Sequence, residues 1–110
     1  MSLSNEDQTF LKTYDDSKYA KPSVTADMVI FSRFSDGSLQ VLLIRRGKSP
    51  YKDQFALPGG FVKPDESVDQ AARRELLEET GVDCACLEPI RTFSTPGRDP
   101  RRWVISCAYL

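Results

Sequence analysis

The most informative stretch of the sequence runs from Gly59 to Val82, GGFVKPDESVDQAARRELLEETGV. Its second half carries three glutamates, Glu75, Glu78 and Glu79, at helical spacing. Because successive residues of a helix are about 100° apart, these carboxylates share a sector of about 100° and repel one another. The stretch therefore raises the question of what makes this repulsion tolerable.

The limits of the helix are marked by residues that cap helix ends. Ser67 and Gln70 have the spacing of a capping box, and Asp69 adds negative charge to the positively polarised first turn. Gly81 can supply the left-handed cap that commonly ends a helix. We therefore predict a helix over residues 67–80, preceded by a loop over residues 59–66.

Two interpretations of the glutamates are open. An exposed acidic face is energetically allowed, because like charges three or four residues apart cost only about 0.2–0.5 kcal/mol per pair. However, Val68, Ala71 and Ala72 lie on the same side of the helix and indicate that this side is packed at its start. A packed helix that presents three carboxylates to neighbouring loops needs a counter-charge, and a divalent cation with oxygen ligands would provide it.

Two neighbouring features bear on this choice. Arg74, four residues before Glu78, can neutralise one carboxylate but not three. The glycines of LPGGF, Gly59 and Gly60, allow a sharp turn that can offer a backbone carbonyl to the same cation. The residues favour metal-assisted chemistry, and the solvated acidic face stays open as the alternative.

Composition narrows the chemistry further. The 110 residues include no histidine, which excludes Ser-His-Asp and Cys-His nucleophile systems. The net charge of −1 gives no global attraction to nucleic acid, and apolar runs such as MVIF are too short to span a bilayer. Cys84, Cys86 and Cys107 are interpreted as reduced core thiols, the first two on one face of a strand. We expect a cytoplasmic protein without a membrane partner.

The remaining patterns predict an α/β domain. Residues 1–22 are a polar lead-in, in which Phe10, Leu11 and Tyr14 could share one helical turn. Two β-like segments, 24–34 and 39–46, flank the Asp-Gly turn of SDGS and predict a hairpin. Further strands are expected in FALP, CACLEPI, RTFS and WVISCAYL, that is, at residues 55–58, 84–90, 91–94 and 103–110.

The run from Gly60 to Val82 resembles the complete Nudix box, G-x5-E-x7-R-E-U-x-E-E-x-G-U, in which U is aliphatic. The matching residues are Gly60, Glu66, Arg74, Glu75, Leu76, Glu78, Glu79, Gly81 and Val82. Seven fixed letters and two aliphatic ones at set spacing arise from composition with odds on the order of one in ten million or rarer. The chain is thus similar to the Nudix hydrolases.

The resemblance implies an α/β/α sandwich around a mixed sheet, and hydrolysis of a nucleoside diphosphate linked to another group with Mg²⁺ or Mn²⁺. In that family the residues matching Glu75, Glu78 and Glu79 bind or orient the metal, with the backbone carbonyl at the position of Gly59. The residue matching Arg74 orients the carboxylates, and the one matching Glu66 steadies the loop. The repulsion would then be tolerated because cations and a pyrophosphate occupy the space between the charges.

The choice of substrate must be sought outside the box. Residues 91–102 contain a basic cluster with a single acid, Asp99, and its arginines are Arg91, Arg98, Arg101 and Arg102. Arginine forks suit phosphate, so we expect substrate contacts from Arg91, Arg98 and Arg101, with a solvated turn as the alternative. Phe93 and Trp103 flank the cluster and could stack on a base or belong to the core.

Looser matches point to a subgroup. KPSVTADMVIF, LPGGFV and PGRDPRRWVISCAYL resemble the ADP-ribose pyrophosphatases and the Nudix domains of nicotinamide-related transcription regulators. The resemblance implies hydrolysis of ADP-ribose to AMP and ribose 5-phosphate. The alternatives are a domain that senses ADP-ribose without cleaving it and an enzyme for an oxidised nucleoside triphosphate.

The same subgroup bears on the extent of the domain and its partners. Nudix domains of this kind continue beyond the strand matching WVISCAYL, so we expect residues 23–110 to be a Nudix domain that is incomplete at its C-terminal end. A nucleic-acid partner is expected only if a DNA-binding domain lies beyond residue 110. We also expect a homodimer.

Overall fold

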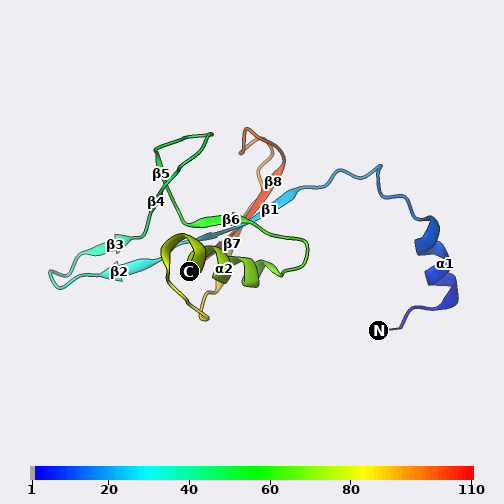
Figure 1. The fold of residues 1–110 in the computed structure, drawn as a ribbon, viewed down its shortest axis with the longest axis horizontal. Coiled ribbons are helices and arrows are strands. Elements are labelled where there is room, and N and C mark those ends of the chain that lie inside the picture. Colours follow the sequence, from blue (N-terminus) through cyan, green and yellow to red (C-terminus); the bar gives the residue numbers. More distant parts are fainter. Residues whose placement is uncertain (1) are drawn as a thin grey trace.

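A computed structural model describes residues 2–110 and shows a mixed β-sheet with one helix packed against it (Figure 1). The helices are α1 (Asn5–Thr13) and α2 (Val68–Thr80). The strands are β1 (Ser23–Met28), β2 (Phe31–Arg33), β3 (Leu39–Val41), β4 (Ile44–Arg45), β5 (Phe55–Ala56), β6 (Gly59–Phe61), β7 (Pro89–Phe93) and β8 (Val104–Tyr109).

The main sheet has the strand order β6-β1-β8-β7. Strands β1 and β8 are parallel, with Thr25 opposite Ser106, whereas β6 and β7 run antiparallel to their neighbours. On the other side of β1, Asp27 lies opposite Gly59. This arrangement confirms the α/β class and the mixed sheet that the sequence predicts.

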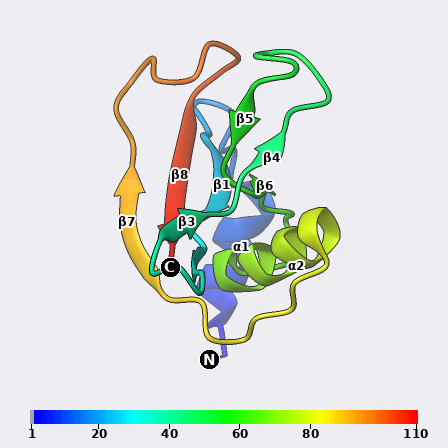
Figure 2. The ribbon, with the colours of Figure 1, turned by 90° about the vertical axis from the view of Figure 1, so that its left-hand side faces the viewer.

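Two further strand pairs extend from the sheet. The β2–β3 hairpin follows the predicted SDGS turn, whose Gly37 has a φ of 86°. The predicted strands 24–34 and 39–46 are each divided, into β1 and β2 and into β3 and β4, because the two halves of each segment pair with different strands. Figure 2 shows the β4–β5 pair and the loop between β7 and β8 at the same end of the molecule.

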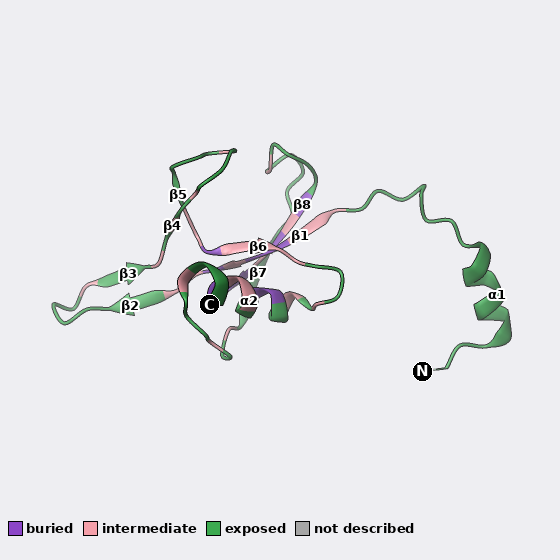
Figure 3. Cartoon of the chain, viewed as in Figure 1, coloured by how far each residue is buried: buried purple, intermediate pink, exposed green. Residues whose placement is uncertain are grey.

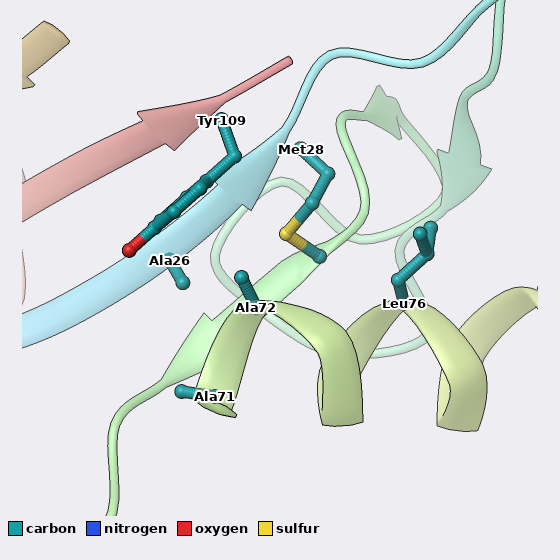
Figure 4. Packing of buried hydrophobic residues seen from close by; sticks show 6 residues of the cluster. All are labelled: Ala26, Met28, Ala71, Ala72, Leu76 and Tyr109. Carbon is teal, nitrogen blue, oxygen red and sulfur yellow. The ribbon is translucent and has the colours of Figure 1, made fainter. Parts of the chain in front are cut away.

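The core lies between α2 and the strands β1 and β8. It consists of small side chains and a few large ones, namely Ala26, Met28, Ala71, Ala72, Leu76 and Tyr109 (Figure 4). The alanines of α2 let the helix approach the sheet closely, and α2 contacts both β1 and β6. Burial is concentrated in this centre, and the hairpins and loops around it are exposed (Figure 3). The core therefore fixes α2 directly against β6.

The ends of α2 are formed as the sequence predicts. The Ser67 side chain accepts a hydrogen bond from the Gln70 backbone N–H, and the Gln70 side chain accepts one from the Ser67 backbone N–H at 2.8 Å. Gly81 takes the left-handed conformation with φ 77°. Asp69 also accepts a hydrogen bond from the Tyr109 hydroxyl, which ties the first turn to β8.

Two predictions about secondary structure are wrong. Residues 59–61, expected in a loop, form strand β6, because the edge of β1 is free to pair and a glycine fits against it. Residues 84–88, expected in a strand, have no regular structure, because they span the distance from the end of α2 to the start of β7. The predicted RTFS strand is part of β7, which begins at Pro89.

The cysteines are free thiols, but only two of them contact the core. Cys84 and Cys107 are half-buried and pack against it, whereas Cys86 is exposed, so its prediction as a core thiol is wrong. Because residues 84–88 form no strand, the two cysteines do not share a strand face.

The N-terminal segment carries more helix than the sequence predicts. Helix α1 has nine residues, with Ser4 as its N-cap, and none of them is buried. Figure 1 shows it apart from the sheet, at the end of an extended segment. Met1, the first residue of the expected lead-in, lies outside the described residues. Within residues 2–110, the helices are all too short and polar to cross a bilayer.

Candidate active site

Arg74 connects most of the acidic residues around α2. It forms two hydrogen bonds to the Glu66 carboxylate, at 2.5 and 2.9 Å, and contacts Glu75 at 2.7 Å and Glu78 at 3.2 Å. It also donates to the carbonyl of Phe61 at 3.3 Å. The hydrogen bonds from Arg74 lower the pKa of Glu66 to about 2. Arg74 thus holds the loop before α2, the helix and β6 in one arrangement.

Glu75 lies directly against the backbone of β6. A Cβ atom at Gly60 would be 2.5 Å from the Glu75 carboxyl carbon and 2.6 Å from both carboxylate oxygens. Real Cβ atoms do not approach other atoms so closely, so position 60 has no room for a side chain. The position of the Glu75 carboxylate therefore explains why the motif begins with a glycine, Gly60.

Glu79 lies one helical turn further along, beside Gly59 and Asp27. The Gly59 N–H donates to Glu79 Oε2 at 3.3 Å, and a Cβ at Gly59 would be 2.5 Å from Asp27 Oδ1. Burial, followed by the charges of Glu75 and Asp27, raises the pKa of Glu79 to about 7 against the opposing effect of the Gly59 N–H. The ion pairs of residues 2–110 leave Glu79 without a cationic partner.

Glu78 is placed differently from the other two glutamates. Its side chain is 56% exposed and meets Arg74, whereas the Glu75 side chain is only 15% exposed. In the part of the chain that the structure describes, no three carboxylate, thiol or imidazole groups are gathered as a ready-made metal site. The structure therefore brings Glu75 and Glu79 together beside Gly59 and Gly60, and keeps Glu78 at the outer edge.

A cavity of about 920 Å³ opens in front of these carboxylates. Its acidic side is formed by α2, β1 and β6, through Asp27, Gly59, Gly60, Glu75 and Glu79. Its other sides carry basic residues from the β4–β5 pair and from the loop between β7 and β8, namely Arg45, Arg46, Lys48, Arg98 and Arg101. The cavity is thus acidic on one side, and on its other sides the basic residues outnumber the single acid there, Asp99.

The predicted arginine cluster is only partly in the cavity. Arg98 and Arg101 line it, whereas Arg91 stacks on Phe93 with 4.9 Å between guanidinium and ring centroid and does not line it. Arg101 is paired with Asp99 through two hydrogen bonds of 3.0 and 2.8 Å, and it lowers the pKa of Asp99 to about 2. Arg98 instead donates to the Ser106 hydroxyl at 2.9 Å.

The two aromatic residues beside the cluster, Phe93 and Trp103, differ in their position relative to the cavity. Phe93 lines the cavity at 41% exposure, so it is available to a ligand. Trp103 is 47% exposed and belongs neither to the core nor to the cavity lining.

Sequence reasoning missed two parts of the cavity. The basic run RRGK, with Arg45, Arg46 and Lys48, could have been noticed as a second local cluster. Asp27 was also detectable, because in β1 the polar Thr25 and Asp27 alternate with the buried Ala26 and Met28. Such alternation places Thr25 and Asp27 together on the face away from the core.

Comparisons with known proteins agree with this geometry. The model of the NUDIX domain family matches residues 21–110. The chain is 43% identical over 107 residues to an "ADPR responsive transcriptional repressor NtrR" of Acinetobacter baylyi, covering 96% of this chain and 42% of the repressor. It is 40% identical over 92 residues to an "ADP-ribose pyrophosphatase" of Methanocaldococcus jannaschii, covering 84% of this chain and 52% of that protein.

A solved structure is also similar. The NUDIX domain of Shewanella oneidensis NrtR, determined in complex with ADP ribose, has a TM-score of 0.82 and 32% identity, over 97% of this chain and 69% of that one. The chain spans about half or less of the length of the two curated relatives. With a family match over most of its length and the complete motif on α2 and the preceding loop, the chain belongs to the Nudix family.

Proposed function

We propose that the protein hydrolyses the pyrophosphate bond of ADP-ribose to AMP and ribose 5-phosphate with the help of a divalent cation. The observation that carries the proposal is the polarity of the cavity. Glu75 and Glu79 face it from α2, and Arg98 and Arg101 face it from a separate loop. A cation with an anionic diphosphate matches both sides.

The donor atoms on the acidic side suit a hard cation such as Mg²⁺ or Mn²⁺. Carboxylate oxygens are the ligands that these ions prefer, and the bare glycine backbone of β6 leaves room beside Glu75. Glu75 and Glu79 would hold the ion, with Glu78 and the Gly59 carbonyl as further ligands. Bound there, the ion would supply positive charge that stabilises the phosphate oxygens as the P–O bond breaks.

The protein's own residues would perform the remaining tasks. Arg74, fixed by Glu66, holds the Glu75 carboxylate in place and limits how far it can turn. Arg98 and Arg101 would bind the phosphate or the terminal ribose, because a guanidinium presents several N–H donors in a fixed plane. Phe93 offers an aromatic face to the adenine.

The choice of ADP-ribose is supported by the relatives. The pyrophosphatase, the repressor and the solved NUDIX domain all carry ADP-ribose in their descriptions. Each description concerns that protein, and its extension to this chain is part of the proposal.

A second candidate function is sensing without hydrolysis. It is favoured by the match to a transcriptional repressor, of which this chain covers 42%. In that case ADP-ribose would bind in the same cavity and the signal would pass to a part of the protein outside the matched region. The intact set of acidic motif residues favours hydrolysis, because a sensor has no need for every carboxylate.

The two functions are separated by a product assay. Purified protein stripped with EDTA is incubated with ADP-ribose, with or without Mg²⁺, and AMP is quantified by chromatography. We expect turnover only with Mg²⁺, and a loss of about a hundredfold or more in kcat for Glu79→Gln with folding retained. Saturable ADP-ribose binding without AMP would establish the sensor instead. Turnover of 8-oxo-dGTP in preference to ADP-ribose would redirect the proposal to oxidised nucleotides.

A further inference from the structure

A continuous chain of hydrogen bonds links the basic and acidic sides of the cavity. Arg98 Nη1 donates to the Ser106 hydroxyl at 2.9 Å, and the Ser106 and Thr25 hydroxyl oxygens are 2.6 Å apart. The Thr25 hydroxyl is in turn 3.1 Å from Asp27 Oδ2. The four residues come from the β7–β8 loop, β8 and β1, and the direct pairing of Thr25 with Ser106 across the parallel strands brings the hydroxyls together.

The chemistry of the end groups sets the direction of the hydrogen bonds at the two ends of this chain. A guanidinium can only donate hydrogen bonds and a carboxylate can only accept them. Ser106 therefore accepts a hydrogen bond from Arg98, and Asp27 accepts one from the Thr25 hydroxyl, which also lies within hydrogen-bond distance of Ser106. A cation and an anion are thus joined through two hydroxyl groups, each of which can donate one hydrogen bond and accept others.

The hydroxyl groups are otherwise costly features of the sheet. Thr25 is 7% exposed and Ser106 is 4% exposed, and alanine or valine would fill such positions without a polar group that must be paired. Within residues 2–110, the hydrogen bonds of both hydroxyls go only to each other, to Arg98 and to Asp27. The hydrogen bonds that pair these two hydroxyls therefore all belong to the link.

The link distinguishes Arg98 from Arg101. Arg101 forms two hydrogen bonds and an ion pair with Asp99. Arg98 forms no ion pair within the described residues. Arg98 lines the cavity and uses one side-chain donor on Ser106, and its other side-chain donors have no hydrogen-bond partner among the described residues. A guanidinium in this state suits the diphosphate of a nucleotide.

At the other end, Asp27 contacts the acidic side. It lines the cavity beside Gly59, at a position where a Gly59 Cβ would come within 2.5 Å of its carboxylate, and its charge acts on Glu79. Burial raises the pKa of Asp27, while Thr25, Arg98 and Ser106 oppose this shift by favouring its charged form. The anion that anchors the chain is thereby adjacent to the carboxylates of α2.

We propose that Asp27, Thr25 and Ser106 are positioning residues that hold Arg98 as the main ligand of the substrate diphosphate. The inference rests on the proposed function for the identity of the ligand, and adds three residues to the site together with an order between the two arginines. Asp27 acts through Arg98, at the far end of the hydrogen-bond chain.

The test is a mutant cycle with ADP-ribose and Mg²⁺. We expect Arg98→Ala to raise KM roughly ten- to a hundredfold. Thr25→Val and Ser106→Ala should each raise KM about three- to tenfold with kcat changed by less than about twofold, and Asp27→Asn should raise KM to a similar extent. Thr25→Ser keeps the hydroxyl and should restore the KM of the wild type, while Ser32→Ala, in the exposed strand β2, serves as an unrelated hydroxyl control.

The decisive comparison is made in the Arg98→Ala background. There, Thr25→Val and Ser106→Ala should change KM by less than about twofold, because the residue through which they act is gone. The same loss in both backgrounds would overturn the proposal, as would equal losses for Thr25→Val and Thr25→Ser. If Asp27→Asn does not fold, the Thr25 and Ser106 variants decide the outcome.

A second measurement needs no substrate. The side-chain N–H signals of Arg98 are identified in ¹⁵N-edited NMR spectra by their absence from Arg98→Lys. They should shift and broaden in Thr25→Val and Asp27→Asn and stay unchanged in Ser32→Ala, whereas unchanged signals in the first two variants would overturn the proposal. If the wild type neither binds nor cleaves ADP-ribose, the proposed function fails, and the NMR comparison alone decides whether the hydrogen-bond chain holds Arg98.

Discussion

The substitution Gly60→Ala tests how closely α2 and β6 are fitted. Added at Gly60, a Cβ would be 2.5 to 2.6 Å from the three carboxyl atoms of Glu75, about 1 Å inside ordinary contact distance. The Glu75 side chain must therefore move, and its hydrogen bond to Arg74, 2.7 Å long, is disturbed with it. Overpacking of this kind costs about 1–3 kcal/mol.

The assay is urea unfolding of Gly60→Ala in two backgrounds. In the wild type the variant should lose about 1–3 kcal/mol of unfolding free energy, whereas in Glu75→Ala, where the colliding carboxyl group is gone, the loss should nearly disappear. Gly47→Ala is the matched control, because no atom lies within 4 Å of the Cβ added there. Its stability should stay constant or rise by up to about 1 kcal/mol, since alanine restricts the unfolded chain.

The comparison between the wild-type and Glu75→Ala backgrounds identifies the group with which the added Cβ collides. An equal loss in the presence and absence of the Glu75 side chain would show that the collision is with the backbone. It would refute the explanation that the Glu75 carboxylate is what requires glycine at position 60. Activity should also fall in Gly60→Ala, because Glu75 is displaced from the position in which Arg74 holds it.

Three further predictions follow from the site. Because the pKa of Glu66 is lowered from 4.5 to about 2, its contribution to stability is present above pH 4.5 and is lost as the pH falls toward 2; the wild type should therefore lose more unfolding free energy than Glu66→Gln over this range, as measured by urea titrations at each pH. Removal of Mg²⁺ with EDTA should weaken the binding of a non-hydrolysable ADP-ribose analogue at least about tenfold in calorimetry, because the carboxylates then repel the diphosphate. Arg91→Ala should leave kcat/KM for ADP-ribose within about a factor of two, since Arg91 lies outside the cavity, and a larger loss would contradict this placement.

Local signals account for the parts of the fold that the sequence predicts well. The ends of α2 depend on Ser67, Gln70 and Gly81, whose effects operate within one turn of the helix. The β2–β3 hairpin likewise depends on the Asp-Gly turn between its strands. Both features are therefore readable without knowledge of the rest of the chain.

The errors involve contacts between residues far apart in the sequence. Strand β6 forms because Gly59 and Gly60 pair with β1, more than thirty residues earlier, and a glycine pair by itself is typical of a loop. The separation of Arg98 from Arg91 depends on the pairing of β7 with β8, which directs the loop between them to the cavity. Arginine spacing in the sequence carries no information about that direction.

The three glutamates of α2 form a single motif in the sequence, but each of them lies in a different environment in the structure. Arg74 carries one positive charge and is shared by Glu66, Glu75 and Glu78, so the acids around it remain in excess even before Glu79 and Asp27 are counted. Across the cavity the imbalance is reversed, because Arg98 has no carboxylate partner among the described residues. A cation alone would satisfy the acidic side, and a phosphate alone would be attracted by the arginines but repelled by the glutamates. A cation and a diphosphate bound together neutralise both sides, so each should increase the affinity for the other, and the repulsion within α2 is then the source of that coupling.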